Sequence, residues 1–210
     1  MSLDLEIFNF VALKAGSGKL NLRKIPNYKQ LLSVDNSFDQ HCLLYSVASY
    51  FKHHLWSQKR KSDPKNYQKW ICDNLNVEGM EFPSGIQDVK KLVENNRHLD
   101  MNISVFLYHN NAIYPEECSI KNNDLQGKNQ INLLKVSRKK DYHYVLIKDI
   151  DLFLSKKYDY GSTYKKKFCP KCLCQFEKED SEKFEKHTRL WLEFYIIELR
   201  TNLQLPLLIF

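Results

Sequence analysis

The first strong pattern of apolar residues predicts a helix over residues 42–55. Its apolar side chains recur three or four positions apart, so that they gather on one helical face. They are Leu44, Val47, Ala48, Phe51 and Leu55. Ser37 or Asp39, just before this stretch, is of the type that caps a helix N-terminus. The pattern therefore predicts a helix whose first turn contains Cys42.

A shorter helix is predicted over residues 85–95. Ser84 and Gln87 have the spacing of a capping box, in which two side chains and two backbone amides pair at the helix start. The side chains expected to face inward are Ile86, Val89 and Val93. This helix would extend the helical layer that residues 42–55 begin.

Beyond the second helix the pattern changes to that of strands. Apolar side chains alternate over residues 103–108 with the two-residue period of a strand. Further strands are predicted over 112–114, 131–136 and 144–150. The charged stretch 137–142 separates the last two, which are therefore expected to form an antiparallel hairpin. Helices followed by antiparallel strands predict the α+β class.

Composition divides the chain into four parts. An α+β domain is expected over residues 1–154, a lysine-rich linker over 155–167, a zinc-finger-like segment over 168–190 and an apolar tail over 191–210. Charged side chains interrupt the tail and its uninterrupted apolar run is short, so we do not expect it to span a membrane. The N-terminus shows no secretory signal, which predicts an intracellular protein of the cytoplasm or nucleus.

Basic residues exceed acidic ones, 32 Lys and Arg against 25 Asp and Glu, giving a formal net charge of +7. The excess is concentrated in three clusters, at residues 59–61, 138–140 and 165–167. Such clusters favour anionic partners, and the cluster at 165–167, next to the zinc-finger-like segment, favours nucleic acid. Basic clusters also occur in solvated loops that bind nothing, and the sequence leaves both interpretations open.

Cys42 and His143 form a candidate catalytic pair. A cysteine in the first turn of a helix is exposed to the positive end of the helix dipole, which favours the reactive thiolate. His143 begins a predicted strand, from which an imidazole could act as general base. Asp39, Asp149 or Asp151 could orient the imidazole, and spacing does not choose among them. The alternative is a purely structural role for both residues.

A second group of cysteines predicts a metal site. The sequence has six cysteines, and Cys169, Cys172 and Cys174 lie within six positions, which suits metal ligation better than disulfides. Cys169 and Cys172 have the spacing of a zinc knuckle, and His187 follows where a finger helix carries its ligand. Cys174 is a candidate fourth ligand, although its closeness to Cys172 is awkward. A degenerate finger that binds no zinc is the alternative.

One segment resembles the nucleophile segment of ovarian-tumour-type (OTU) cysteine peptidases. It reads Asp39, Gln40, His41, Cys42, Leu43, Leu44, Tyr45, Ser46, Val47 and Ala48. His143 with Tyr144 is similar to the histidine strand of that family. The resemblance implies a papain/OTU-like helix and antiparallel sheet, with Cys42 as nucleophile and His143 as base. It also implies a ubiquitin-like or other protein substrate.

A broader resemblance covers roughly residues 33–190. An ordered set of short motifs is similar to a segment of proteins from Polinton (Maverick) virus-like transposons, which lies upstream of a protein-primed family B DNA polymerase. The motifs are residues 42–48, 78–83, 102–108, 113–115, 131–134, 143–154 and 168–172. The resemblance implies a mobile-element origin. The alternative to a cysteine peptidase is therefore a non-catalytic zinc- and nucleic-acid-binding accessory module of a transposon replication protein.

Overall fold

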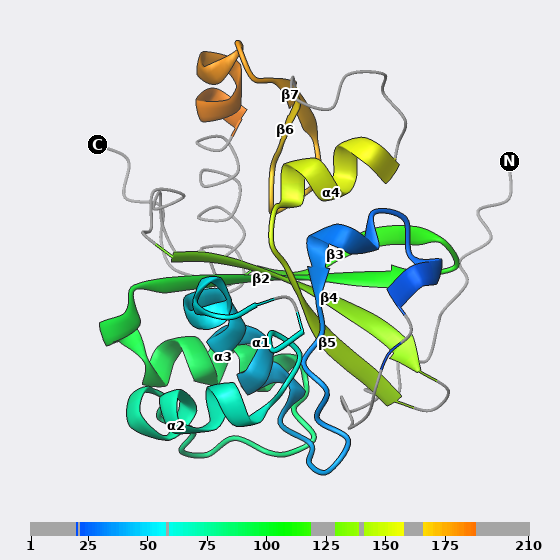
Figure 1. The fold of residues 1–210 in the computed structure, drawn as a ribbon. Coiled ribbons are helices and arrows are strands. Elements are labelled where there is room, and N and C mark those ends of the chain that lie inside the picture. The colour runs from blue at the N-terminus through cyan, green and yellow to red at the C-terminus, as the bar shows by residue number, and fades with distance from the viewer. Residues whose placement is uncertain are drawn as a thin grey trace, which may run out of the picture.

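A computed structural model describes residues 20, 22–57, 59–118, 129–138, 141–157 and 166–187. These residues form one five-stranded sheet, a two-stranded sheet and helices on both faces of the larger sheet (Figure 1). The α+β class predicted from the sequence is confirmed.

The larger sheet has the strand order β1-β5-β4-β2-β3. Its strands are β1 (Leu31–Leu32), β2 (Met101–His109), β3 (Ala112–Cys118), β4 (Asn129–Arg138) and β5 (Asp141–Ile147). The predicted hairpin is present, because β4 pairs with β5 in antiparallel register. However, β2 and β4 run parallel, so the sheet is mixed and the prediction of an antiparallel sheet was wrong in this respect. A hairpin and a crossover differ in chain path between the strands, which strand periodicity does not encode.

Several α-helices and 3-10 helices in the described part of the chain accompany the larger sheet. They are η1 (Leu22–Lys24), η2 (Tyr28–Gln30), α1 (Cys42–Lys52), η3 (His53–Leu55), α2 (Lys65–Asn74), α3 (Ile86–Asn95), η4 (Arg97–Leu99) and α4 (Ile150–Lys157). The sequence predicted α1 and α3 but missed α2 and α4. In α2 only Tyr67 is buried, so its apolar signal is weak.

The sheet separates two hydrophobic cores. On one face, α1 and α3 pack against side chains from β2, β4 and β5, including Ile103, Leu133 and Tyr144. On the other face, α4 and the 3-10 helices near the N-terminus cover Phe106, Leu134 and Val145. The alternation of side chains along each strand assigns every strand residue to one core or the other.

Helix α1 is enclosed over its first two turns. Every residue from Cys42 to Ser49 is buried, because the sheet and α2 pack against the helix and side chains of α3 complete the same core. The N-cap residue is His41, which makes no capping bond through its side chain. Asp39 instead accepts the backbone N–H of His41 at 3.0 Å and so orders the turn before the helix. The prediction that Ser37 or Asp39 is the N-cap residue was therefore wrong, because the helix begins directly after His41.

The cap of α3 also lies one residue from its predicted place. The N-cap is Gly85, whose backbone N–H donates to Asp88 Oδ2 at 2.8 Å. Ser84 is fully buried and does not cap the helix. The two buried apolar residues of the helix are Val89 and Leu92.

The C-terminal cysteine segment packs on the second core. Helix α4 continues beyond residue 154 to Lys157, and Asp151 accepts the backbone N–H of Phe168 at 2.9 Å. Phe168 itself is part of the second core. The rest of the predicted linker, 158–165, and the apolar tail, 191–210, lie outside the described residues. None of the helices among the described residues has the length and apolar content that a membrane crossing requires.

Candidate metal centre

Cys42 lies in the apolar core and not at an accessible helix tip. Its side chain is 1% exposed and belongs to the core formed by α1, α3 and the sheet. Burial raises the pKa of the thiol to about 12, although a backbone N–H of Tyr144 partly offsets this effect. The thiol is therefore protonated at neutral pH, whereas a nucleophile must be a thiolate.

His143 faces the opposite side of the sheet from Cys42. Its neighbours on β5, Tyr142 and Tyr144, both pack into the core that contains Cys42. His143 therefore projects to the other face, where its cross-strand partner Val136 belongs to the second core. The ring is 1% exposed, and its Nε2 lies 3.1 Å from Ser33 Oγ. The structure does not bring Cys42 and His143 together as a catalytic pair.

The three predicted orienting carboxylates serve other contacts. Asp39 accepts the hydroxyl of Tyr45 at 2.8 Å. Asp149 accepts the backbone N–H of Leu152 at 2.9 Å and so caps α4. Asp151 ties α4 to Phe168, and burial raises the pKa of its carboxyl. Asp39 and Asp149 therefore bond within their own segments, whereas Asp151 connects α4 with Phe168 on β6.

The predicted metal ligands do come together. The small sheet consists of β6 (Lys166–Phe168) and β7 (Gln175–Glu177), paired antiparallel. The turn between them is closed by bonds from Cys169 N to the Cys174 carbonyl and from Leu173 N to the Cys169 carbonyl. Leu173 adopts a left-handed φ of 61°, which the tight turn requires. A helical segment at residues 181–187 follows and carries His187.

The ligand atoms of Cys169, Cys172 and His187 all lie within 4.8 Å of one another. Cys172 Sγ and His187 Nε2 are 3.2 Å apart. Ligand atoms bound to one tetrahedral zinc ion, at about 2.3 Å for sulfur and about 2.1 Å for nitrogen, are separated by roughly 3.6–3.8 Å. Small adjustments of side-chain torsions would therefore place all three ligands around one ion.

The electrostatics of this cluster also suit a metal. Burial lowers the pKa of His187, which favours the neutral imidazole that ligates metals. A backbone N–H of Cys174 donates to the Cys172 sulfur, an interaction that would support a thiolate. Burial nonetheless raises the pKa of Cys172, so without a cation this thiol stays protonated at neutral pH. A bound cation would supply the missing charge stabilisation.

Aromatic packing holds the cluster in place. Phe176 contacts the Phe184 ring at 5.4 Å and the His187 ring at 4.8 Å between centroids. Phe176 and Phe184 therefore form a small aromatic core beside the ligand cluster. Cys174 is exposed, and its thiol hydrogen-bonds that of Cys172 but is not one of the three grouped ligands.

One polar contact of the sheet was not predicted from the sequence. Ser33 follows β1, and its hydroxyl meets His143 because β1 pairs with β5 at the sheet edge. No local motif surrounds Ser33, so only the strand pairing could have revealed this contact.

No protein-family model, no curated protein and no solved structure matches this chain. The resemblances to OTU peptidases and to Polinton proteins therefore stay predictions from the sequence.

Proposed function

We propose that this chain is a zinc-binding module. It holds nucleic acid on the basic surface of its α+β domain, which consists of the larger sheet and the helices that cover it. The observation that carries the proposal is the grouping of Cys169, Cys172 and His187 within 4.8 Å. Two thiolates and one imidazole are ligands that zinc prefers, whereas magnesium and calcium prefer oxygen. The chemistry of the donor set therefore supports zinc.

The role of zinc here would be structural. Phe168 and Leu173, on either side of Cys169, pack against the second core. His187 lies on the helical segment that follows the small sheet. An ion bound by both parts would fix that segment to the body of the protein, as structural zinc sites do.

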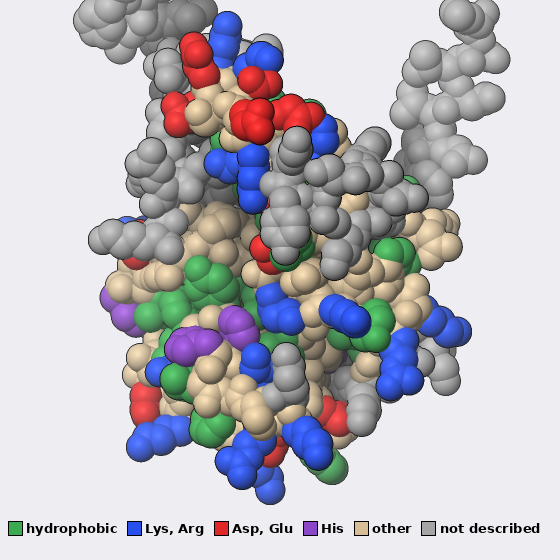
Figure 2. Space-filling view, turned by 45° about the horizontal axis from the view of Figure 1, so that its top comes forward, with side chains coloured by type: hydrophobic (Ala, Val, Ile, Leu, Met, Phe, Trp, Pro, Cys, Tyr) green, Lys and Arg blue, Asp and Glu red, His purple; other side chains and the backbone are tan. Residues whose placement is uncertain are grey.

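A basic loop supports nucleic acid as the partner. The backbone of residues 59–63 is held in a fixed turn, in part by Tyr67, whose hydroxyl donates to the Lys61 carbonyl at 2.7 Å. Lys148 lies near Lys61, and burial together with that second cation lowers the pKa of Lys148. A bound phosphate would relieve this repulsion between cations. Figure 2 shows Lys and Arg side chains along the lower rim of the molecule.

The cysteine segment is less suited to contact nucleic acid. Lys166 forms an ion pair with Glu177, and Lys183 forms one with Asp180. The Lys167 ammonium lies 4.0 Å from the centroid of the Phe184 ring. Basic and acidic side chains therefore neutralise each other there, as the mixed colours at the top of Figure 2 illustrate. We therefore propose that nucleic acid contacts the α+β domain and not residues 165–167.

A mobile-element origin belongs to the same proposal, and its support is the ordered set of sequence motifs. In that setting the module would assist a replication protein. The cysteine-peptidase hypothesis, with its ubiquitin-like substrate, has no support from the position of Cys42 or His143.

Metal analysis tests the zinc site. The purified chain, reconstituted with zinc and dialysed, is expected to hold one zinc ion per chain by elemental mass spectrometry. Cys169→Ser should lower the zinc affinity at least about 100-fold, because it removes a ligand outright. Cys72→Ser, which changes an exposed thiol on α2, is the matched control. Equal zinc content in both variants would refute the site.

Salt-dependent binding tests the nucleic-acid partner. Fluorescence anisotropy with a single-stranded oligonucleotide should show an affinity that falls as salt rises. Charge reversal of Lys59, Arg60 and Lys61 to Glu should weaken binding at least about 10-fold at low salt. Reversal of three finger lysines, Lys178, Lys183 and Lys186, should change it less than about threefold. Binding that is absent at low salt contradicts the proposal.

A further inference from the structure

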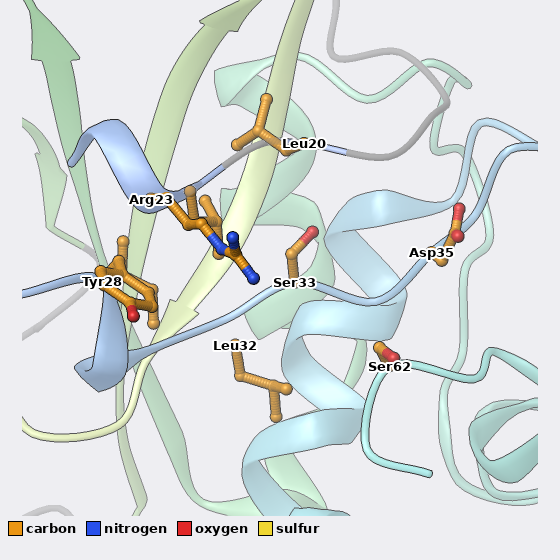
Figure 3. A pocket seen from close by; sticks show the side chains of 9 residues that line it. Leu20, Arg23, Tyr28, Leu32, Ser33, Asp35 and Ser62 are labelled. Atoms are coloured by element: carbon orange, nitrogen blue, oxygen red, sulfur yellow. The ribbon is translucent and has the colours of Figure 1, made fainter. Parts of the chain in front are cut away.

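A cavity lies beside the sheet edge, at the contact between Ser33 and His143. Its volume is about 660 Å³, within the range of about 300–1,000 Å³ that is typical of small-molecule sites. Most of its lining surface is apolar. Figure 3 shows Leu20, Tyr28 and Leu32 among the side chains that surround it. The lining residues from η1, η2 and β1 include Leu22, Arg23, Tyr28, Leu31 and Leu32.

Ser33 joins this cavity to the buried histidine. The serine is partly exposed and lines the cavity, while its Oγ lies 3.1 Å from His143 Nε2. His143 is held rigidly, because its ring is 1% exposed on the face of β5 that packs in the second core. A hydroxyl bonded to an imidazole and open to a cavity is the arrangement of an activated nucleophile.

Two charged groups lie on either side of the serine. Figure 3 shows Ser33 between the guanidinium of Arg23 and the carboxylate of Asp35, both of which line the cavity. Asp35 Oδ1 is shielded from solvent and accepts no hydrogen bond among the described residues. A ligand with an N–H or O–H donor would satisfy that oxygen, while an anionic group would suit Arg23.

We propose that Ser33 is a nucleophile and His143 its general base in acyl transfer from small esters that carry an anionic group. The Ser33 oxygen forms a bond to the acyl carbon while its proton passes to His143 Nε2. The bond to the leaving alcohol then breaks, and the alcohol takes that proton. Water next adds to the acyl-serine, again giving a proton to His143, which returns it to the serine oxygen as the acid is released.

The apolar walls would hold the acyl chain, and Arg23 would bind the anionic group. This activity goes beyond the proposed binding function and depends on neither zinc nor nucleic acid.

Covalent labelling tests the nucleophile directly. A fluorophosphonate should form a phosphonyl–serine bond at Ser33 with loss of fluoride, located by peptide mass spectrometry. Ser33→Ala should abolish the adduct, and His143→Gln should slow labelling at least about 100-fold, the usual contribution of a general base. Ser57→Ala removes an exposed serine elsewhere and should leave labelling unchanged. Absence of label from the folded wild-type chain, or equal labelling of Ser33→Ala, overturns the proposal.

Hydrolysis of two esters tests the role of Arg23 and does not rely on the buried histidine variant. The 4-nitrophenyl monoester of succinic acid carries an anion, whereas 4-nitrophenyl acetate does not. Arg23→Gln, a change at an exposed residue, should raise KM for the succinate ester about 10-fold, the range for a charged hydrogen bond. It should leave the acetate ester unchanged. An equal loss for both esters, or hydrolysis that survives Ser33→Ala, contradicts the assignment.

Discussion

Two thiols of this chain are almost equally buried, but one is inert in an apolar core and the other is a candidate metal ligand. Cys42 is 1% exposed and Cys169 is 0% exposed. Cys42 is surrounded by aliphatic and aromatic side chains of the first core. Cys169 instead lies beside a second thiol and an imidazole. Burial alone therefore does not decide what a cysteine can do, because the neighbouring groups determine whether a thiolate can be stabilised.

The two regions also differ in how their residues are brought together. Cys169, Cys172 and His187 lie on one short hairpin and the helical segment after it, so local structure assembles them. Cys42 and His143 belong to different elements, and their meeting depends on the face of β5 that His143 occupies. A shift of one residue along a strand moves a side chain to the other face. Local spacing is thus a better guide to a site than a pair of distant residues.

The largest expected effect is the low reactivity of the Cys42 thiol, which lacks the neighbours that Cys169 has. At pH 8 a thiol with a pKa of about 12 is ionised in roughly one molecule in ten thousand. Iodoacetamide should therefore modify Cys42 roughly 1,000-fold more slowly than Cys72, which is exposed on α2. Peptide mass spectrometry over a time course measures both rates in one sample.

Unfolding provides the control for this measurement, since both thiols should react at similar rates in concentrated guanidinium chloride. Fast alkylation of Cys42 in the folded chain would refute the conclusion that this thiol is unreactive. Labelling of Cys42 by an electrophilic ubiquitin or peptide probe would also refute it and would restore the cysteine-peptidase hypothesis.

Much of the fold was accessible from the sequence because its signals are local. The apolar spacing after Cys42 predicted α1, and the charged stretch between two apolar runs predicted the β4–β5 hairpin. The parallel pairing of β2 with β4 was missed because it depends on the path of the chain and not on any strand's own pattern. Helix α2 was missed because it buries only Tyr67.

The site predictions also succeeded where the signal is local and failed where it depends on how distant segments pack. The position of Cys42 in the first helical turn predicted an accessible thiol, but every residue from Cys42 to Ser49 is buried, so the helix start did not distinguish core from surface. Likewise, the start of a strand says nothing about which face His143 occupies. The zinc ligands were found because their spacing within one small unit fixes their geometry.

A smaller effect is expected on stability at high pH. The pKa of Cys42 is about 12 in the folded protein against 9.0 for a free thiol, so ionisation opposes folding. The stabilisation from the protonated thiol is complete below pH 9 and is lost as pH rises towards 12. The loss amounts to at most about 4 kcal/mol, since each pH unit corresponds to about 1.4 kcal/mol.

Comparison with Cys42→Ala isolates this contribution. The raised pKa values of Tyr45 and Tyr67 have no contribution from Cys42, so the titration of these two tyrosines cancels in the difference. Urea denaturation at pH 7, 9 and 10.5 should show that the wild-type protein loses stability more steeply above pH 9 than the variant does. At pH 7 the variant should be less stable by about 1 kcal/mol, from the loss of one small buried side chain. Parallel pH profiles would show that Cys42 is accessible to water after all.

The smallest effect is expected at Cys174, the candidate fourth ligand. Its side chain is exposed and outside the group of three ligand atoms, while its backbone closes the turn through the bond from Cys169 N. Cys174→Ser retains that backbone bond, so zinc affinity should change less than about threefold, compared with at least about 100-fold for Cys169→Ser. Competition with a zinc-binding dye measures both affinities. A loss above about 10-fold for Cys174→Ser would instead mean that the thiol turns inward when zinc binds. The centre would then have three cysteines and one histidine, and the turn would supply a further ligand through a residue that lies outside the group of three ligand atoms.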